Sequence, residues 1–203
     1  MADYALALML AVARKVPAID RKCREMNWGK ITTRDVSHAV LGLFGLGAIG
    51  RQVAKRAQAF DMKVLAYDPF WPEEFARGNG IEKADARTIF QRADFISLHL
   101  PLTEETEGFV GEAELAMMKP TAILINTARG GLVDEKALLR ALKENRIYGA
   151  GLDAFAHEPP EDDDWFTLDN VVLGSHCAAS TTGATENMGR MATENIIRDL
   201  KGE

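Results

Sequence analysis

The sequence has only two cysteines in 203 residues, Cys23 and Cys177. They lie far apart and form no C-x-x-C pair or other metal-ligand spacing, which favours a reducing, cytoplasmic compartment. The acidic run at residues 161–164 lacks the spacing of an EF-hand, so it is expected to be a solvated loop. The sequence therefore predicts no metal site.

An excess of basic residues is also missing. Lys and Arg number 24 against 30 Asp and Glu, which gives a net charge of −6, and no basic stripe is present. Nucleic-acid binding depends on clustered Lys and Arg, so a nucleic acid is not an expected partner. The sequence has no internal repeat or inner boundary, and we expect residues 1–203 to form a single domain.

No apolar run is long enough to suggest a membrane segment. The run at residues 4–13 is well short of the ~20 residues that a membrane span requires. Asp3 precedes it, and Arg14 and Lys15 follow it, which is the wrong charge order for an export signal. We predict instead one helix over residues 3–25, capped by Asp3. Because the chain begins inside this helix, we expect it to be a piece of a longer protein.

A polar connector with one large aromatic side chain, Trp28, follows this helix at residues 26–35. The helix carries more apolar surface than one domain face can cover, so residues 3–35 are predicted to form a homodimer interface. The alternative is a surface loop with one tucked-in Trp.

Strand-like apolar runs alternate with helical patterns from residue 39 onward. We predict strands at residues 39–44, 64–67, 95–100, 122–125, 149–152 and 171–173, and helices at 49–60, 86–92, 112–118, 134–144 and 181–200. This alternation predicts an α/β domain with a doubly wound parallel sheet and helices on both faces.

One stretch combines a strand, a glycine-rich turn, a helix and a second strand. Gly45, Gly47 and Gly50 match G-x-G-x-x-G, which permits a tight turn, close approach of a pyrophosphate, and packing of helix on strand. The phosphates would lie at the positive end of the helix that begins near Ala48. Asp68 ends the second strand, where a carboxylate can bind ribose hydroxyls, and no Arg follows closely. A Rossmann-type domain that binds NAD rather than NADP is therefore predicted.

Ligands of such sheets gather at the carboxyl ends of the strands. Arg129 lies there on a glycine-flanked turn and is a candidate to bind a substrate carboxylate. Three of the four histidines, His99, His157 and His176, lie there too, and spacing alone does not choose among them as acid–base group. Glu158 can orient an imidazole and stabilise its protonated form.

Together these motifs resemble the D-isomer-specific 2-hydroxyacid dehydrogenases over essentially the whole chain. The resemblance implies an NAD-dependent oxidoreductase that interconverts a D-2-hydroxy acid and a 2-oxo acid, with a small anionic acid as substrate. The branch with Glu-Pro-Pro and the Ala-Ser-Thr ending is similar to phosphoglycerate dehydrogenase. The segments that carry the resemblance are residues 5–14, residues 45–50, Tyr67-Asp-Pro69, His99-Leu-Pro-Leu-Thr103, Asn126-Thr-Ala-Arg-Gly-Gly-Leu-Val-Asp-Glu135, Leu152-Asp-Ala-Phe155, Glu158-Pro-Pro160, Ser175-His176 and Ser180-Thr181.

The resemblance also implies roles, residue by residue. His176 would be the acid–base residue, Glu158 its partner and Arg129 the clamp for the substrate carboxylate. For the cofactor, the resemblance implies the amides of Ala48 and Ile49 on the pyrophosphate, Asp68 on the adenosine ribose, Asp153 near the carboxamide, Pro101 and Thr103 along the cleft, and the Ala128 carbonyl facing the nicotinamide.

The chain departs from the family pattern in two ways. Ser175 stands where the family usually has Pro before the catalytic His, which frees one backbone dihedral angle. The substrate domain that usually precedes this domain is absent, so the 203-residue chain is expected to bind NAD with weak turnover or none. Because a fold does not fix a function, an NAD-sensing, corepressor-like scaffold without turnover is the alternative.

Overall fold

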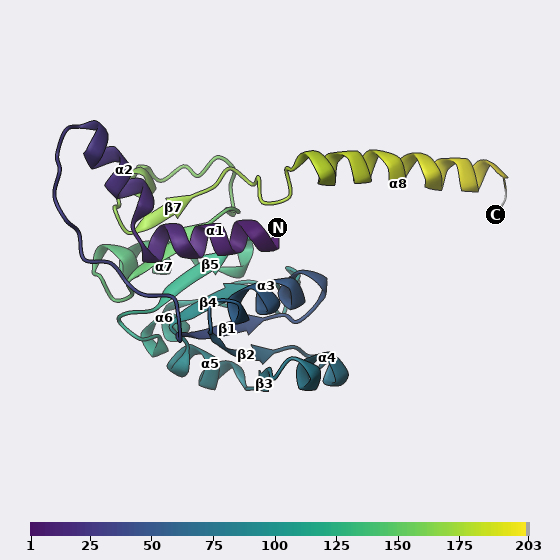
Figure 1. Cartoon of the computed structure of the whole chain (residues 1–203), viewed down its shortest axis with the longest axis horizontal. Coiled ribbons are helices and arrows are strands. Elements are labelled where there is room, and N and C mark those ends of the chain that lie inside the picture. Colours follow the sequence, from purple (N-terminus) through teal and green to yellow (C-terminus); the bar gives the residue numbers. More distant parts are fainter. Residues whose placement is uncertain (202–203) are drawn as a thin grey trace.

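Seven parallel strands form one sheet at the centre of the computed structural model, which describes residues 1–201 (Figure 1). The strands lie in the order β3-β2-β1-β4-β5-β6-β7, so the winding direction reverses between β1 and β4. The predicted doubly wound α/β fold is confirmed. The strands are β1 Val40–Phe44, β2 Lys63–Tyr67, β3 Glu82–Lys83, β4 Phe95–Leu98, β5 Ile123–Asn126, β6 Gly149–Leu152 and β7 Val171–Leu173.

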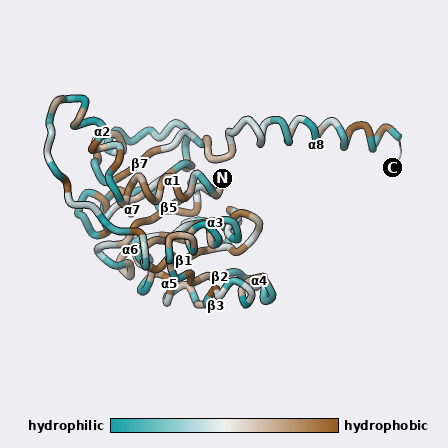
Figure 2. The backbone as a smooth tube through the Cα atoms, in the orientation of Figure 1, coloured by the Kyte–Doolittle hydropathy of each residue, from teal (hydrophilic) through white to brown (hydrophobic). Residues whose placement is uncertain are grey.

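Helices cover both faces of this sheet (Figure 1). On one face lie α1 (Ala2–Ala13) and α3 (Ala48–Gln58), and on the other lie α5 (Ala86–Arg92), α6 (Glu112–Met117) and α7 (Glu135–Lys143). Successive strand residues point to opposite faces, and both faces are buried, so the central strands must be apolar at every position. Figure 2 shows the resulting apolar colour along the strands.

Alternate residues of one strand therefore belong to two separate cores. Leu41 and Leu43 of β1 pack beneath α1 and α3, whereas Phe44 packs with Phe90 of α5, at a ring-centroid distance of 4.8 Å. The two cores together fix the sheet between its helices. The carboxyl ends of β1, β4, β5 and β6 consequently come to one edge, where the predicted site residues follow the strands.

The prediction of one N-terminal helix over residues 3–25 is wrong. The chain forms α1 and a separate α2 (Val16–Arg24), because Lys15 adopts a left-handed conformation with φ of 50° and Pro17 occupies the first turn of α2. Asp3 does not cap α1 either. It lies in the first turn, and its carboxylate forms an ion pair with Arg56 of α3 at 2.6 Å.

Two short elements escaped the sequence-based prediction. The edge strand β3 has only two residues, both exposed, and α4 (Glu73–Gly78) has only six. Neither is long enough to show a hydrophobic period. Two single-turn 3₁₀ helices, Gly130–Leu132 and Asp163–Phe166, complete the ordered elements of residues 1–201 outside the C-terminal helix.

The last helix, α8 (Thr182–Lys201), confirms the predicted C-terminal helix but extends away from the rest of the chain (Figure 1). It has no buried residue. Every helix within residues 1–201 is too short or too polar to cross a membrane.

The glycine turn after β1 generates a stability prediction. A Cβ atom on Gly50 would overlap the backbone carbonyl oxygen of Gly45, whereas a Cβ atom on Gly47 would meet no atom within 4 Å. We expect Gly50→Ala to lower the free energy of unfolding by about 2 to 3 kcal/mol because the backbone must shift. Gly47→Ala, the matched control, should change it by less than about 1 kcal/mol. Denaturant titration of both variants decides this, and equal stabilities would contradict the close approach.

Candidate active site

A cleft of about 670 Å³ opens at the carboxyl edge of the sheet. Ile49, Pro101, Ala128 and Arg129, which the sequence assigns to one site, all line it. Thr103 does not line it; its backbone amide instead donates to the Thr106 hydroxyl at 2.8 Å. The structure thus brings together residues from three separate loops.

The glycine turn forms one wall of this site. Gly45 has φ of 98°, and a Cβ atom there would lie 2.6 Å from the His99 carbonyl oxygen, so only glycine fits. Gly47 is different, because nothing in the protein fills the space beside it. The first amides of α3, from Ala48 and Ile49, begin at this open position and have no acceptor within the helix. The open space and the helix end together suit an anionic group.

Asp68, at the end of β2, ties the glycine turn to the following loop. One carboxylate oxygen accepts from the Leu46 amide at 2.6 Å, and the other accepts from the Phe70 amide at 2.7 Å. Each carboxylate oxygen has a further lone pair, so the group can still accept from a ribose hydroxyl. Asp68 therefore has a structural function in addition to the one predicted for it.

The turn that carries Arg129 is shaped by Asn126, the last residue of β5. Its side-chain amide donates to the Arg129 carbonyl at 2.8 Å, and its side-chain oxygen accepts from the Ala128 amide at 3.0 Å. The exposed Arg129 guanidinium donates to the Ala128 carbonyl at 2.8 Å. Asn126 was not predicted as a site residue, although an Asn that ends a strand just before a turn is a recognisable turn signal.

His176 and Glu158 form a direct pair. The His176 Nδ1 atom lies 2.8 Å from Oε2 of Glu158 and 3.0 Å from Oε1. Oε1 also accepts from the Phe155 amide at 3.0 Å. That amide, then the imidazole, lowers the pKa of Glu158, and the charge of Arg129 adds to the effect. The carboxylate is thus ionised at neutral pH, and with Nδ1 held by it, Nε2 is the nitrogen that can exchange a proton with a substrate.

The loop that carries His176 is held by Asp153. His176 has φ of 57°, a conformation that side chains other than Gly adopt only under constraint. The Asp153 carbonyl accepts from the His176 amide at 2.8 Å, and its carboxylate accepts from the amides of Cys177 at 3.0 Å and Ala178 at 2.7 Å. Asp153 is only 1% exposed, so its carboxylate lies inside this loop.

The other three histidines lie in different environments. The His99 imidazole forms a hydrogen bond with Ser97 at 2.9 Å, and burial lowers its pKa to about 4. His157 borders a separate pocket beside Trp165, and His38 lies before β1 at the opposite edge of the sheet. Among the described residues, His176 is the histidine whose ring contacts a carboxylate.

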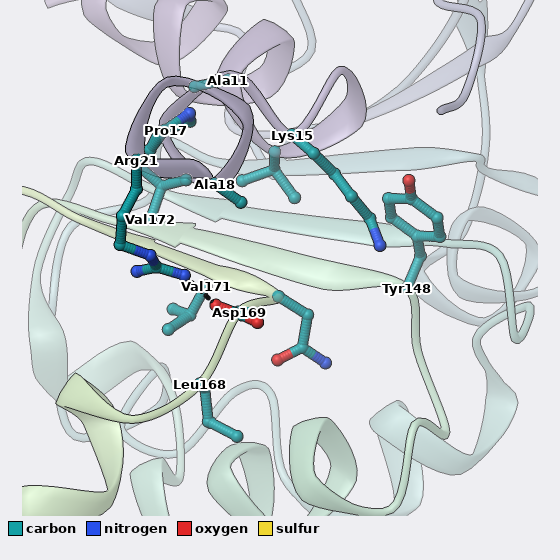
Figure 3. Close-up of a pocket in the computed structure, with 12 residues that line it drawn as sticks. Ala11, Lys15, Pro17, Ala18, Arg21, Tyr148, Leu168, Asp169, Val171 and Val172 are labelled. Carbon is teal, nitrogen blue, oxygen red and sulfur yellow. Dashed lines mark hydrogen bonds and ion pairs between the residues drawn. The ribbon is translucent and has the colours of Figure 1, made fainter. Parts of the chain in front are cut away.

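A second hollow of about 480 Å³ adjoins His176 and Glu158 and is lined on its other sides by apolar residues that include Phe155, Phe166 and Leu173. A third pocket lies at the amino ends of β6 and β7, below α1 and α2 (Figure 3). It measures only about 40 Å³, and an ion pair between Arg21 and Asp169 crosses its rim. A dinucleotide cannot enter it, so the carboxyl edge is the candidate site.

Comparison with known proteins places these residues in context. The profile of the D-isomer specific 2-hydroxyacid dehydrogenase NAD-binding domain matches residues 6–178. D-3-phosphoglycerate dehydrogenase of Methanocaldococcus jannaschii is 44% identical over 206 residues, which are 100% of this chain and 39% of that protein. Glyoxylate reductase of Korarchaeum cryptofilum is 45% identical over 210 residues, covering 100% of this chain and 63% of that protein.

Solved structures show the same similarity. D-lactate dehydrogenase from Aquifex aeolicus, complexed with NAD and lactic acid, superposes with a TM-score of 0.91 at 30% identity, over 99% of this chain and 66% of that chain. D-lactate dehydrogenase with NAD⁺ from Lactobacillus jensenii gives 0.90 at 32% identity, over 100% of this chain and 66% of that chain. The chain thus spans less than two thirds of the length of the curated relatives it matches.

The environment of His99 predicts how stability depends on pH. Because burial holds its folded-state pKa near 4, the unfolded chain binds an extra proton between about pH 6.5 and pH 4. The free energy of unfolding should therefore fall by about 2 to 3 kcal/mol from this group as pH drops through that range. His99→Gln should remove this part of the pH dependence, and His157→Gln should leave it. Urea titrations at several pH values measure it; a slope unchanged in His99→Gln would contradict the assignment.

Proposed function

The chain belongs to the D-isomer specific 2-hydroxyacid dehydrogenase family and forms its NAD-binding domain, and from that premise we propose that it serves the interconversion of a D-2-hydroxy acid and a 2-oxo acid. The observation that carries the proposal is the His176–Glu158 pair at the carboxyl edge of the sheet. The curated relatives named above are a dehydrogenase and a reductase, so the predicted alternative of a scaffold without turnover gains no support.

The residues present fit an NAD molecule. The space beside Gly47, which a Cβ atom would enter without touching protein, leaves room for the pyrophosphate against the amides of Ala48 and Ile49. Asp68 would hold the adenosine ribose. Pro101, Thr103, Ala128 and Asp153 would lie toward the nicotinamide half. When bound, NAD supplies the hydride acceptor or donor.

The acid–base step falls to His176. In the direction of oxidation, its neutral Nε2 takes the hydroxyl proton of the substrate, and Glu158 stabilises the imidazolium that forms. In the direction of reduction the imidazolium returns that proton to the carbonyl oxygen. Arg129 would bind the substrate carboxylate with its planar guanidinium, since its charge already reaches Glu158 across the site.

We further propose that the protein forms a homodimer through residues 3–35. The structure narrows the surface concerned, because α1 already packs on its own sheet, whereas α2 has no buried residue. Met26 and Trp28, beyond α2, are 88% and 86% exposed. Large apolar side chains exposed in this way are typical of an interface. The two free cysteines, Cys23 and Cys177, support the proposed cytoplasmic location, which cell fractionation would check.

The acid–base assignment predicts the behaviour of Glu158→Gln and His176→Asn in the native gene product. We expect kcat/KM for NADH-dependent reduction of 2-oxo acids to fall by about 10²- to 10⁴-fold in His176→Asn and by less in Glu158→Gln. Binding of NADH, followed by its fluorescence, should be unchanged in both. Glu161→Gln, in the same exposed loop, is the matched control and should keep full activity. Normal turnover by His176→Asn would overturn the proposal.

The proposed interface predicts the association state. Replacing Met26 and Trp28 together by Ser should convert a dimer into a monomer in light scattering, because both lose apolar contact area. Phe70→Ser, which removes an equally exposed aromatic at another surface, should leave the dimer intact. A wild-type chain that is monomeric at micromolar concentration would rule out this interface.

A further inference from the structure

Tyr4, on the first turn of α1, reaches the loop that carries His176. Its hydroxyl lies 3.1 Å from the Cys177 sulfur, although the two residues are 173 positions apart in the sequence. The helix behind it is firmly anchored, since Leu6, Leu8 and Met9 are buried against the sheet. Tyr4 therefore joins the core of the domain to the residue that follows His176.

The Cys177 side chain has a second neighbour in Asp153. Its sulfur lies 3.6 Å from Oδ1 of Asp153, the oxygen that also accepts from the Cys177 amide. The thiol is thus held between the Tyr4 hydroxyl and the Asp153 carboxylate, and it does not meet the imidazole of His176, as expected for sequence neighbours.

Gly174 shows how closely these groups converge. A Cβ atom at this position would overlap Oδ1 of Asp153 and would lie 2.8 Å from the Tyr4 hydroxyl oxygen. The glycine therefore leaves the space that both groups occupy beneath the loop. Removal of one of these polar groups would leave its partner without a hydrogen bond in a partly buried place.

The Tyr4 hydroxyl keeps its proton throughout the physiological range. The hydrogen bond with Cys177, and then burial, raise the pKa of Tyr4 to about 12, with the Asp153 charge adding to the effect. The contact is consequently present at every pH at which the enzyme works. It is a fixed brace and not a switch.

We propose that Tyr4 is a positioning residue for His176. Its hydroxyl, through Cys177, fixes the left-handed backbone that aims the His176 imidazole at Glu158 and at the substrate. The effect on turnover rests on the proposed function of His176, whereas the effect on the loop does not. Misplacement of a catalytic group by a fraction of an ångström is enough to slow a reaction without weakening cofactor binding.

Tyr4→Phe tests this proposal, because it removes only the hydroxyl and keeps the ring. Loss of one neutral hydrogen bond should speed hydrogen exchange of the Cys177 and Ala178 amides by about 3- to 10-fold and shift the NMR signals of the His176 ring. In the native gene product, kcat should fall by a similar factor of about 3 to 10 while KM for NADH is unchanged. Circular dichroism checks that the fold is intact.

Tyr148→Phe is the matched control. The Tyr148 hydroxyl lies 3.4 Å from the Ala13 carbonyl at the far end of α1, beside Lys15 (Figure 3). Its removal also takes one hydroxyl from the surroundings of α1, but away from His176. Amide exchange at Cys177 and kcat should both stay at wild-type values in this variant.

A second substitution on the other side of the contact makes the test decisive. Cys177→Ala should reproduce the effect of Tyr4→Phe, Cys177→Ser should restore most of the wild-type behaviour, and the double variant should be no slower than either single variant. Fully additive effects, or unchanged exchange and ring signals in Tyr4→Phe, would overturn the proposal. If the loop loosens in Tyr4→Phe while His176→Asn keeps full activity, the proposed function fails and the positioning of the loop stands.

Discussion

Close approach of backbone to backbone holds the carboxyl edge of the sheet together. Gly45 touches the end of β4 at His99, Gly50 touches Gly45, and Gly130 touches the backbone of Phe155 and its successor, each at a distance that excludes a Cβ atom. These contacts join loops that follow four different strands. Every site residue depends on them, since Arg129 is attached next to Gly130 and Glu158 follows Phe155 by three residues.

Buried polar side chains add the finer positioning. Asn126 shapes the turn that carries Arg129, and Asp153 holds the three successive amides that begin at His176. Both are almost fully buried, at 1% exposure each, so their hydrogen bonds are shielded from water and costly to break. The groups proposed for chemistry, Arg129 and His176, are exposed. The domain thus separates rigid, buried supports from accessible reactive groups.

The sequence predicts the sheet well because each central strand is buried on both faces and therefore reads as an unbroken apolar run. It predicts the glycine turn for a similar reason, since steric exclusion at Gly45 and Gly50 permits no other residue. It fails at the break near Lys15, because the apolar and basic pattern continues through a left-handed residue. Tyr4 and Asn126 were missed as site residues, because their contacts depend on which segments the fold brings together. The choice of His176 among the histidines came from family resemblance, not from spacing.

The histidines show why spacing was insufficient, since a single residue type acquires opposite properties at one edge of the sheet. Burial without a carboxylate leaves His99 with a pKa of about 4, so it is neutral and cannot act as a general acid near neutral pH. His176 lies half exposed with Nδ1 on an ionised carboxylate, which stabilises the proton that a base must accept. The carboxylate itself stays ionised because the Phe155 amide and the imidazole both donate to it. Acid–base capacity at this edge is therefore decided by three-dimensional surroundings that begin with the position of a glutamate 18 residues away.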